Sequence, residues 1–335
     1  MLFEKIKKII ALLIATGCLI MITSCKKNKT DNTDAGNTSG IFSEVVETPD
    51  GIGFLREFKN FISENGFNVY DISVISGSLS ASETVTEANP CQNSYSVAKA
   101  FCVHAVGILY DRGVIDLKEK ITDILKDDIY YSYDKRWDNV TVHDAMSHKI
   151  GLKEGFLDID CLDATEFGED YLKYILETPF ETEPCTKYVY TDAAYYLVAR
   201  IVEKKTGEPL DKFLYKELFY PAKFREVAWT KCPLGHVIGA TGLYIRSEDA
   251  VKLPAIYSGQ GIYNGSRYVS EDWVKIVEEN NYEFSPVEDT GWRGKGGMRG
   301  QMVMYSRDKN VAVAWHGYCC DNKKMTAFVT DYFKN

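Results

Sequence analysis

The sequence predicts an α/β fold of the α+β type, in which an antiparallel sheet flanked by helices carries an inserted, mostly helical region. Strand-like patterns occur at about 66–85 and 236–335, whereas helical patterns dominate about 90–235. The chain has 335 residues, of which 45% are hydrophobic, and this is enough for a sizeable core. With a net charge of -9 and no long basic stretch in its body, the chain is not expected to bind nucleic acid.

The first residues have the composition of an export signal, with lysines, then an apolar run, then a short segment before Cys25. This pattern predicts a lipoprotein signal peptide at 1–24, a lipid on Cys25, and an exported protein anchored to the outer face of a bacterial membrane. A plain transmembrane anchor is the alternative. Residues 25–48 are polar without apolar periodicity and predict a flexible tether, so the globular domain is expected at 49–335.

Nine cysteines are present, of which Cys18 would leave with the signal and Cys25 would carry the lipid. An exported protein can form disulfides, but the seven remaining cysteines are an odd number, so at least one thiol is expected to stay free. The segment from His316 to Cys320 has no second ligand cluster to accompany it. A buried strand end or a disulfide is therefore favoured there over a metal site.

The domain is expected to open with an amphipathic helix over 51–66, followed by a strand over 68–78 that ends at Gly77. A long amphipathic helix begins near Ser96 and stops at Gly113. Further helices are predicted wherever apolar residues recur at helical spacing, at 113–125, 139–152, 160–180, 190–210, within 239–263, and at 321–333. Residues 299–318 predict two strands joined by a hairpin over 307–310.

Ser-x-x-Lys occurs four times, beginning at Ser24, Ser96, Ser132 and Ser306, and only Ser96 opens a long amphipathic stretch. Helical positions three apart face the same way, so Ser96 and Lys99 would project together. A lysine beside buried apolar surface loses solvation, which lowers its pKa and suits it to accept the serine proton. The start of the helix would also favour a developing oxyanion at Ser96. The alternative is a helix-start serine beside a surface lysine.

Together with four later blocks, this segment resembles the serine beta-lactamase-related hydrolases. That family includes class C beta-lactamases, D-Ala-D-Ala carboxypeptidases, related esterases and hydrolases of aminohexanoate oligomers. The resemblance runs from about residue 52 to residue 330, with blocks in the family's order at 93–125, 140–152, 188–210, 241–253 and 261–274. It implies a beta-lactamase/transpeptidase-like, penicillin-binding fold and a covalent acyl-enzyme, with no metal and no organic cofactor.

By this resemblance Ser96 is the nucleophile, Lys99 its base partner, and Tyr190 the tyrosine that moves a proton between Ser96 and the leaving group. Tyr188 is the alternative register. Asp192 stands where the family usually has asparagine, and an ionised carboxylate can accept hydrogen bonds but cannot donate them. Beside Lys99 it would raise the lysine pKa and weaken it as a base, unless it only caps its helix.

The third family motif is best matched by Lys295, Gly296 and Gly297, although its usual threonine is missing. The resemblance implies that Lys295 receives a substrate carboxylate, with help from Arg299, and that the backbone N–H groups of Ser96 and Met298 form the oxyanion hole. The alternative match is His316 with Gly317. A further family residue, His148, is expected to hold a loop near the cleft.

The resulting prediction is a membrane-anchored serine hydrolase whose substrate is a small-molecule or peptide ester or amide. General esterase or amidase activity ranks first, because both departures from the motifs fall where beta-lactam and peptide carboxylates are usually bound. The alternatives are a beta-lactamase or D-Ala-D-Ala carboxypeptidase, a penicillin-recognising sensor lipoprotein that acylates without turnover, and a solute-binding lipoprotein. The oligomeric state is left open.

Overall fold

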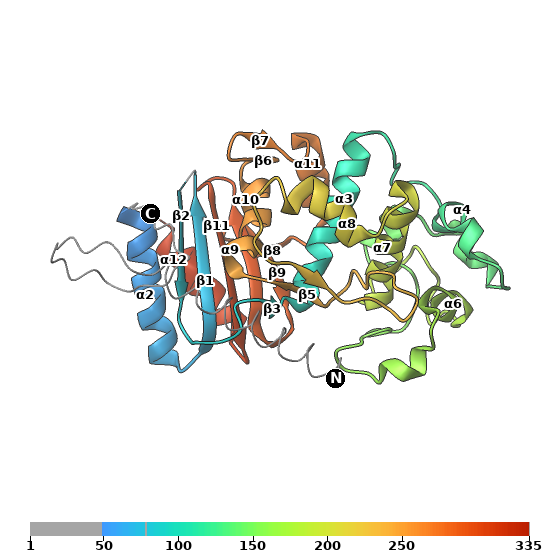
Figure 1. Cartoon of the computed structure of the whole chain (residues 1–335), viewed down its shortest axis with the longest axis horizontal. Coiled ribbons are helices and arrows are strands. Elements are labelled where there is room, and N and C mark those ends of the chain that lie inside the picture. Colours follow the sequence, from blue (N-terminus) through green and yellow to red (C-terminus); the bar gives the residue numbers. More distant parts are fainter. Residues whose placement is uncertain (1–48, 78, 335) are drawn as a thin grey trace, which may run out of the picture. The chain divides into compact units, whose positions relative to one another are not determined.

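A six-stranded antiparallel sheet forms the centre of the fold in the computed structural model, which describes residues 49–77 and 79–334 (Figure 1). Its strand order is β2-β1-β11-β10-β9-β8, so the N-terminal strand β1 pairs along its length with the C-terminal strand β11. The bounds are β1 Asn68–Ser76, β2 Leu79–Thr84, β8 Ser285–Val287, β9 Trp292–Gly297, β10 Gln301–Ser306 and β11 Val311–Tyr318. The predicted fold class is confirmed, since both ends of the domain build one sheet.

Within the described residues, five short strands lie outside this sheet. A three-stranded sheet has the order β3-β5-β4, and β6 pairs with β7. Their bounds are β3 Gln92–Asn93, β4 Ala228–Trp229, β5 Leu243–Ile245, β6 Ile262–Tyr263 and β7 Ser266–Arg267. Within the range 236–335 that the sequence assigned to the sheet, the main sheet takes only 285–318.

Alternate residues of the main sheet enter two separate cores, as the two-residue period of a strand requires. Val303 and Tyr305 of β10 pack with the inserted helical region, whereas Met304 packs with the first and last helices. Figure 1 shows α2 (Pro49–Asn65) and α12 (Asn322–Tyr332) along one face of the sheet, with α9 and α10 at the other. The inserted region is therefore attached to a sheet that is covered on both sides.

The remaining helices lie mostly where the sequence predicted them, but the helix at 271–280 was not predicted and two predicted helices differ in the structure. Their bounds are α3 Ala98–Asp111, α4 Ile121–Ile124, α5 Val142–Met146, α6 Tyr171–Glu177, α7 Asp192–Thr206, α8 Leu210–Leu214, α9 Ser247–Ala250, α10 Lys252–Ser258 and α11 Glu271–Asn280. The helix predicted over 160–180 is wrong as one element, because Gly168 takes φ 69° and ψ -160° and breaks the helical backbone. The new helix α6 then starts after Asp170, whose side chain accepts from the Lys173 backbone N–H.

The helix predicted from Ser96 also begins differently. Ser96 lies in a 3₁₀ turn, Tyr95–Val97, and the α-helix α3 starts at Ala98. Every residue of α3 from Ala98 to Leu109 is buried, so the helix is not amphipathic but enclosed. It contacts α7, α8 and α11, and a helix surrounded by other elements is expected to be apolar on all sides.

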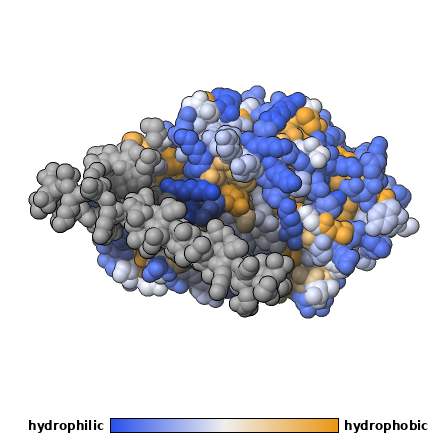
Figure 2. Space-filling model, in the orientation of Figure 1, coloured by the Kyte–Doolittle hydropathy of each residue, from blue (hydrophilic) through white to orange (hydrophobic). Residues whose placement is uncertain are grey.

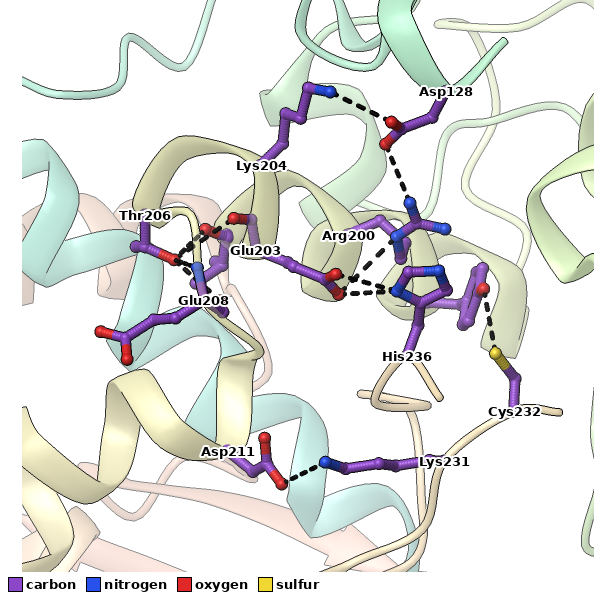
Figure 3. A network of polar contacts seen from close by, with 12 residues as sticks. Asp128, Arg200, Glu203, Lys204, Thr206, Glu208, Asp211, Lys231, Cys232 and His236 are labelled. Carbon is purple, nitrogen blue, oxygen red and sulfur yellow. Dashed lines mark hydrogen bonds and ion pairs between the residues drawn. The ribbon is translucent and has the colours of Figure 1, made fainter. Parts of the chain in front are cut away.

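Polar contacts anchor the C-terminal half of α7 (Figure 3). The buried Arg200 donates to Asp128 at 2.9 Å, and Lys204 donates to the same carboxylate at 3.0 Å. Glu203 meets His236 Nδ1 at 2.9 Å. Since Asp192 is the first residue of α7, these contacts hold the helix whose start enters the candidate site.

The described surface on the face drawn in Figure 2 is mostly hydrophilic, with hydrophobic residues in small separate areas. No helix within 49–77 and 79–334 is long and apolar enough to cross a bilayer. The predicted signal peptide, the tether and Cys25 lie outside the described residues. All seven cysteines inside the described part are free thiols.

Candidate active site

The half-buried Ser96 lies between a lysine of α3 and a tyrosine of the irregular segment that precedes α7. Its Oγ is 3.0 Å from Lys99 Nζ and 2.8 Å from the hydroxyl of Tyr190. Tyr95, directly before it, has φ 47°, an uncommon value for a residue with a side chain, and its N–H is held by the Asn93 side chain. The turn therefore presents the Ser96 hydroxyl in the geometry of a nucleophile with proton-transfer partners.

Lys99 is fully buried, and its ammonium group has three acceptors. These are Ser96 Oγ at 3.0 Å, the carbonyl oxygen of Ala240 at 2.9 Å, and Asp192 Oδ1 at 2.7 Å. An ammonium carries three N–H donors, so this arrangement uses each of them. The contacts suit a charged lysine that donates to Ser96.

The pKa of Lys99 has been shifted upward, against the expectation drawn from burial. Burial by itself lowers the pKa of this lysine, but the charge of Asp192, followed by those of Tyr190 and Glu283, outweighs it. The predicted lowering of the lysine pKa is therefore wrong, whereas the predicted effect of Asp192 is in the right direction. With its proton held this firmly, Lys99 is poorly suited to act as a base.

Asp192 begins α7 but turns its carboxylate toward Lys99 and not onto the helix. Its own backbone N–H is satisfied by the carbonyl of Phe156 at 3.1 Å. The side chain of the N-cap residue Thr191 makes no capping hydrogen bond. Asp192 is thus a counter-ion at the site, and the alternative of a simple helix cap does not describe its contacts.

Tyr190, and not Tyr188, contacts Ser96. The carbonyl of Tyr190 accepts from the Gly155 N–H at 3.0 Å, and its ring has Lys99 Nζ at 4.8 Å and Lys295 Nζ at 5.0 Å from the centroid. Tyr188 is 59% exposed. Two cations therefore lie at the ring of Tyr190, and neither of these contacts involves the ring of Tyr188.

Strand β9 brings the third motif to the same place. Lys295 Nζ lies 3.4 Å from the Tyr190 hydroxyl. A Cβ atom on Gly297 would come within 2.4 Å of the Ser94 carbonyl oxygen, so the glycine permits the strand to approach the Ser96 turn. Gly296 and Gly297 close the strand, and Met298 starts the next turn. The oxyanion role of the Met298 N–H stays a prediction.

The two remaining sequence candidates have structural partners. His316 lies in β11 and pairs with Asp71 at 3.0 Å, so it does not take the place of the third motif. His148 accepts from the Thr191 N–H through Nδ1 at 3.4 Å, and its ring is 4.5 Å from that of Tyr190. This is the loop-holding position expected for it.

Glu283 is a site residue that the sequence did not reveal. Its buried carboxylate pairs with Lys295 and accepts from His148 Nε2 at 2.7 Å. Burial by itself raises the pKa of Glu283, but Lys295 and His148 reverse this and hold it well below the usual range. The charge of Glu283 in turn raises the pKa of Lys295, against the lowering that burial causes. Glu283 follows α11 in an irregular segment with φ 60°, and no motif surrounds it.

Three carboxylates form the acidic side of the site. Oxygens of Asp158, Asp160 and Asp192 lie within 4.8 Å of one another. Asp192 is already paired with Lys99, and Asp160 accepts from the Thr241 hydroxyl. Burial raises the pKa of Asp160, and the nearby charge of Asp192 adds to this. The cluster therefore does not offer a cation three free carboxylates.

Comparison with known proteins gives a consistent result. The family model described as Beta-lactamase matches residues 62–270. The N-acetylmuramyl-L-alanine amidase of Bacillus subtilis (strain 168) is 29% identical over 38% of this chain and 30% of its own length, so the chain matches under a third of that relative.

Solved structures agree on the fold. A family VIII carboxylesterase superposes with TM-score 0.67 and 14% identity, over 86% of this chain and 97% of the other. A penicillin-binding protein homolog from Caulobacter crescentus has TM-score 0.66 and 14% identity, over 85% and 97%. Identities this low establish the shared fold and leave the substrate open.

Proposed function

The chain belongs to the beta-lactamase family, and on this premise we propose that it is a serine hydrolase that forms a covalent acyl-enzyme on an ester or amide substrate. The observation that carries the proposal is the position of Ser96 Oγ between Lys99 Nζ at 3.0 Å and the Tyr190 hydroxyl at 2.8 Å. A serine needs a proton acceptor within this distance to attack a carbonyl carbon.

The contacts assign separate roles to the two partners. In its deprotonated form Tyr190 takes the Ser96 proton as Oγ bonds to the substrate carbonyl carbon. The Lys99 ammonium donates to Oγ and stabilises negative charge there, and Lys295 does the same for the tyrosine oxygen. Backbone N–H groups of Ser96 and Met298 are proposed to bind the oxyanion of the tetrahedral intermediate.

Breakdown of the intermediate completes the acylation. The bond to the leaving group breaks, the leaving oxygen or nitrogen takes the proton from Tyr190, and the acyl group stays on Ser96 as an ester. Water then attacks this ester and passes a proton to Tyr190, which returns it to Ser96 Oγ as the Oγ–acyl bond breaks and the carboxylic acid is released. All bonds and protons balance among these residues, the substrate and water.

A fluorophosphonate probe tests the nucleophile. It should label the wild type and not Ser96→Ala. Ser132→Ala is the matched control, because Ser132 begins another Ser-x-x-Lys segment but is exposed, and this variant should label like the wild type. Equal labelling of Ser96→Ala and wild type would remove the basis for the proposal.

One observation favours a second candidate function, in which the acyl-enzyme forms but is hydrolysed slowly. Lys99 is held as an ammonium, so the site has little basic capacity beyond Tyr190 to activate water. A penicillin-recognising sensor that acylates and hardly turns over would use the same contacts. Incubation with a chromogenic ester panel and a chromogenic cephalosporin, followed by intact mass, separates the two: released product without adduct supports the hydrolase, and a stable adduct without product supports the sensor.

We also propose that the protein is exported and carries a lipid anchor at Cys25, because residues 1–25 have the composition of a lipoprotein signal. In a bacterial host, the wild type should be found in the membrane fraction and incorporate labelled fatty acid. Cys25→Ser should lose the label. Incorporation that persists in Cys25→Ser would exclude lipidation at this position.

A further inference from the structure

A continuous chain of hydrogen bonds leads from Ser96 to a buried carboxylate. The Tyr190 hydroxyl donates to Ser96 Oγ at 2.8 Å, and Lys295 Nζ donates to the Tyr190 hydroxyl oxygen at 3.4 Å. Lys295 also pairs with the carboxylate of Glu283. The Glu283 side chain is only 3% exposed, so its two oxygens depend on donors from the protein and not on water.

Both oxygens of Glu283 have donors, and this fixes its protonation state. His148 Nδ1 accepts from the Thr191 N–H at 3.4 Å, so the proton of the neutral imidazole is on Nε2. That Nε2 donates to Glu283 Oε1 at 2.7 Å, and Lys295 donates to Oε2. A carboxylate that accepts on both oxygens is ionised. The contacts therefore place a full negative charge at Lys295.

Glu283 is the group that keeps Lys295 charged. Among the described residues it is the only carboxylate that forms an ion pair with Lys295, and the other titratable groups nearby include Tyr190, Lys99 and Tyr188. Burial lowers the pKa of Lys295 and the charge of Lys99 adds to this, but Glu283 and then Tyr190 reverse the shift. Without Glu283, the lysine would lose both its charge and one of its two fixed partners.

We propose that Glu283 is a positioning residue for the proton-transfer step: it holds Lys295 at the Tyr190 oxygen, and His148 holds Glu283 in turn. The inference rests on the proposed hydrolase function, and Glu283 acts through Lys295 without contacting Ser96. In the proposed reaction Tyr190 takes the Ser96 proton in its deprotonated form, and an ammonium at the phenol oxygen stabilises that form. A displacement of that ammonium by about 1 Å costs about a hundredfold in rate.

The rate at which a fluorophosphonate probe labels Ser96 tests this role without a known substrate. Glu283→Gln keeps an amide oxygen for His148, but its NH₂ group would face the Lys295 ammonium as donor against donor. Labelling should be about ten- to a hundredfold slower than in the wild type near neutral pH. Its alkaline decline should also begin at lower pH, because Glu283 no longer opposes the lowering that burial causes in the pKa of Lys295.

Two further variants serve as controls. Glu279→Gln makes the same change at an exposed glutamate of α11 and should label like the wild type. Glu283→Asp keeps the charge and should return the alkaline decline toward its wild-type position. Wild-type labelling in Glu283→Gln overturns the positioning role. Slower labelling with an unshifted pH profile also overturns it, because a merely structural contribution would produce that result.

A double variant tests whether Glu283 acts through Lys295. In Lys295→Gln the ammonium is absent, so adding Glu283→Gln should slow labelling little further, whereas independent roles would multiply the two losses. The double variant removes both buried charges, and it therefore keeps the test decisive if Glu283→Gln alone does not fold. Multiplied losses overturn the inference.

A titration separates this inference from the proposed hydrolysis. The NMR signal of the Lys295 ε-methylene, assigned by its loss in Lys295→Gln, should titrate at lower pH in Glu283→Gln than in the wild type. If the probe does not label the wild type but this shift is found, the result counts against the hydrolase alone. An unchanged titration of Lys295 overturns the inference even where labelling is observed.

Discussion

Replacing Asp192 by asparagine removes the counter-ion of a lysine that has no access to water. The side chain of Lys99 is 0% exposed and that of Asp192 is 8% exposed, with 2.7 Å between Nζ and Oδ1. Burial lowers the pKa of a lysine, so without Asp192 the pKa of Lys99 should fall below its ordinary value. In Asp192→Asn, Lys99 should thus be a buried neutral amine.

The pH dependence of folding stability distinguishes the wild type from Asp192→Asn. In the wild type the folded-state pKa of Lys99 lies above the unfolded value, so its stabilisation is fully present below about pH 10 and is lost only as pH rises through the folded value. In Asp192→Asn the folded-state pKa lies below the unfolded value. The unfolded state then binds more protons, and stability should increase with pH by about 1.4 kcal/mol per unit between about pH 7 and pH 9.

Denaturant unfolding at several pH values measures this difference. At about pH 8, Asp192→Asn should be about 3 kcal/mol less stable than the wild type, and the gap should narrow as pH rises toward 10. Asp123→Asn, an exposed aspartate on α4, is the matched control and should follow the wild type. Parallel curves of stability against pH for Asp192→Asn and wild type would refute the assignment of Asp192 as the partner that keeps Lys99 charged.

Activity and acid stability provide two further predictions. Gly297→Ala should lower kcat/KM about a hundredfold, because its Cβ would meet the Ser94 carbonyl at 2.4 Å and displace the Ser96 turn. Gly296→Ala is the control and should be tolerated, because its Cβ meets nothing closer than 3.6 Å. Burial lowers the pKa of His104 to about 3, so its folded form resists protonation and stability should fall by about 1.4 kcal/mol per unit as pH drops below 6.5. His104→Leu should remove that dependence in urea unfolding between about pH 6 and pH 4.5.

Two outcomes would contradict these predictions. Equal kinetics in the two glycine variants would mean that the approach of β9 to the Ser96 turn does not position the nucleophile. An unchanged acid slope in His104→Leu would mean that His104 finds a proton acceptor on charging, although neither of its ring nitrogens has a hydrogen-bond partner among the described residues.

The sequence by itself determined helix ends, hairpin turns and the residues that lie in recognisable motifs. The helix α7 ends at Gly207, in the left-handed conformation that glycine adopts without cost, and the hairpin between β10 and β11 lies where its turn residues predicted it. Ser96, Lys99 and Tyr190 could be named as candidates because they lie in two recognisable blocks. Their spacing along the chain carries that information before any folding.

Tertiary structure alone decided the charge state of the site. Glu283 has no motif, yet the fold places it against Lys295 and His148, and so Lys295 cannot serve as the open cation that its motif predicts. Likewise, burial of Lys99 suggested a weakly held proton, whereas Asp192 at 2.7 Å reverses the shift. The pKa shift of each lysine depends on its distance in space from its carboxylate. Lys99 and Asp192 are 93 residues apart in the sequence, and Lys295 and Glu283 are 12 apart, and these separations do not encode the distances in space.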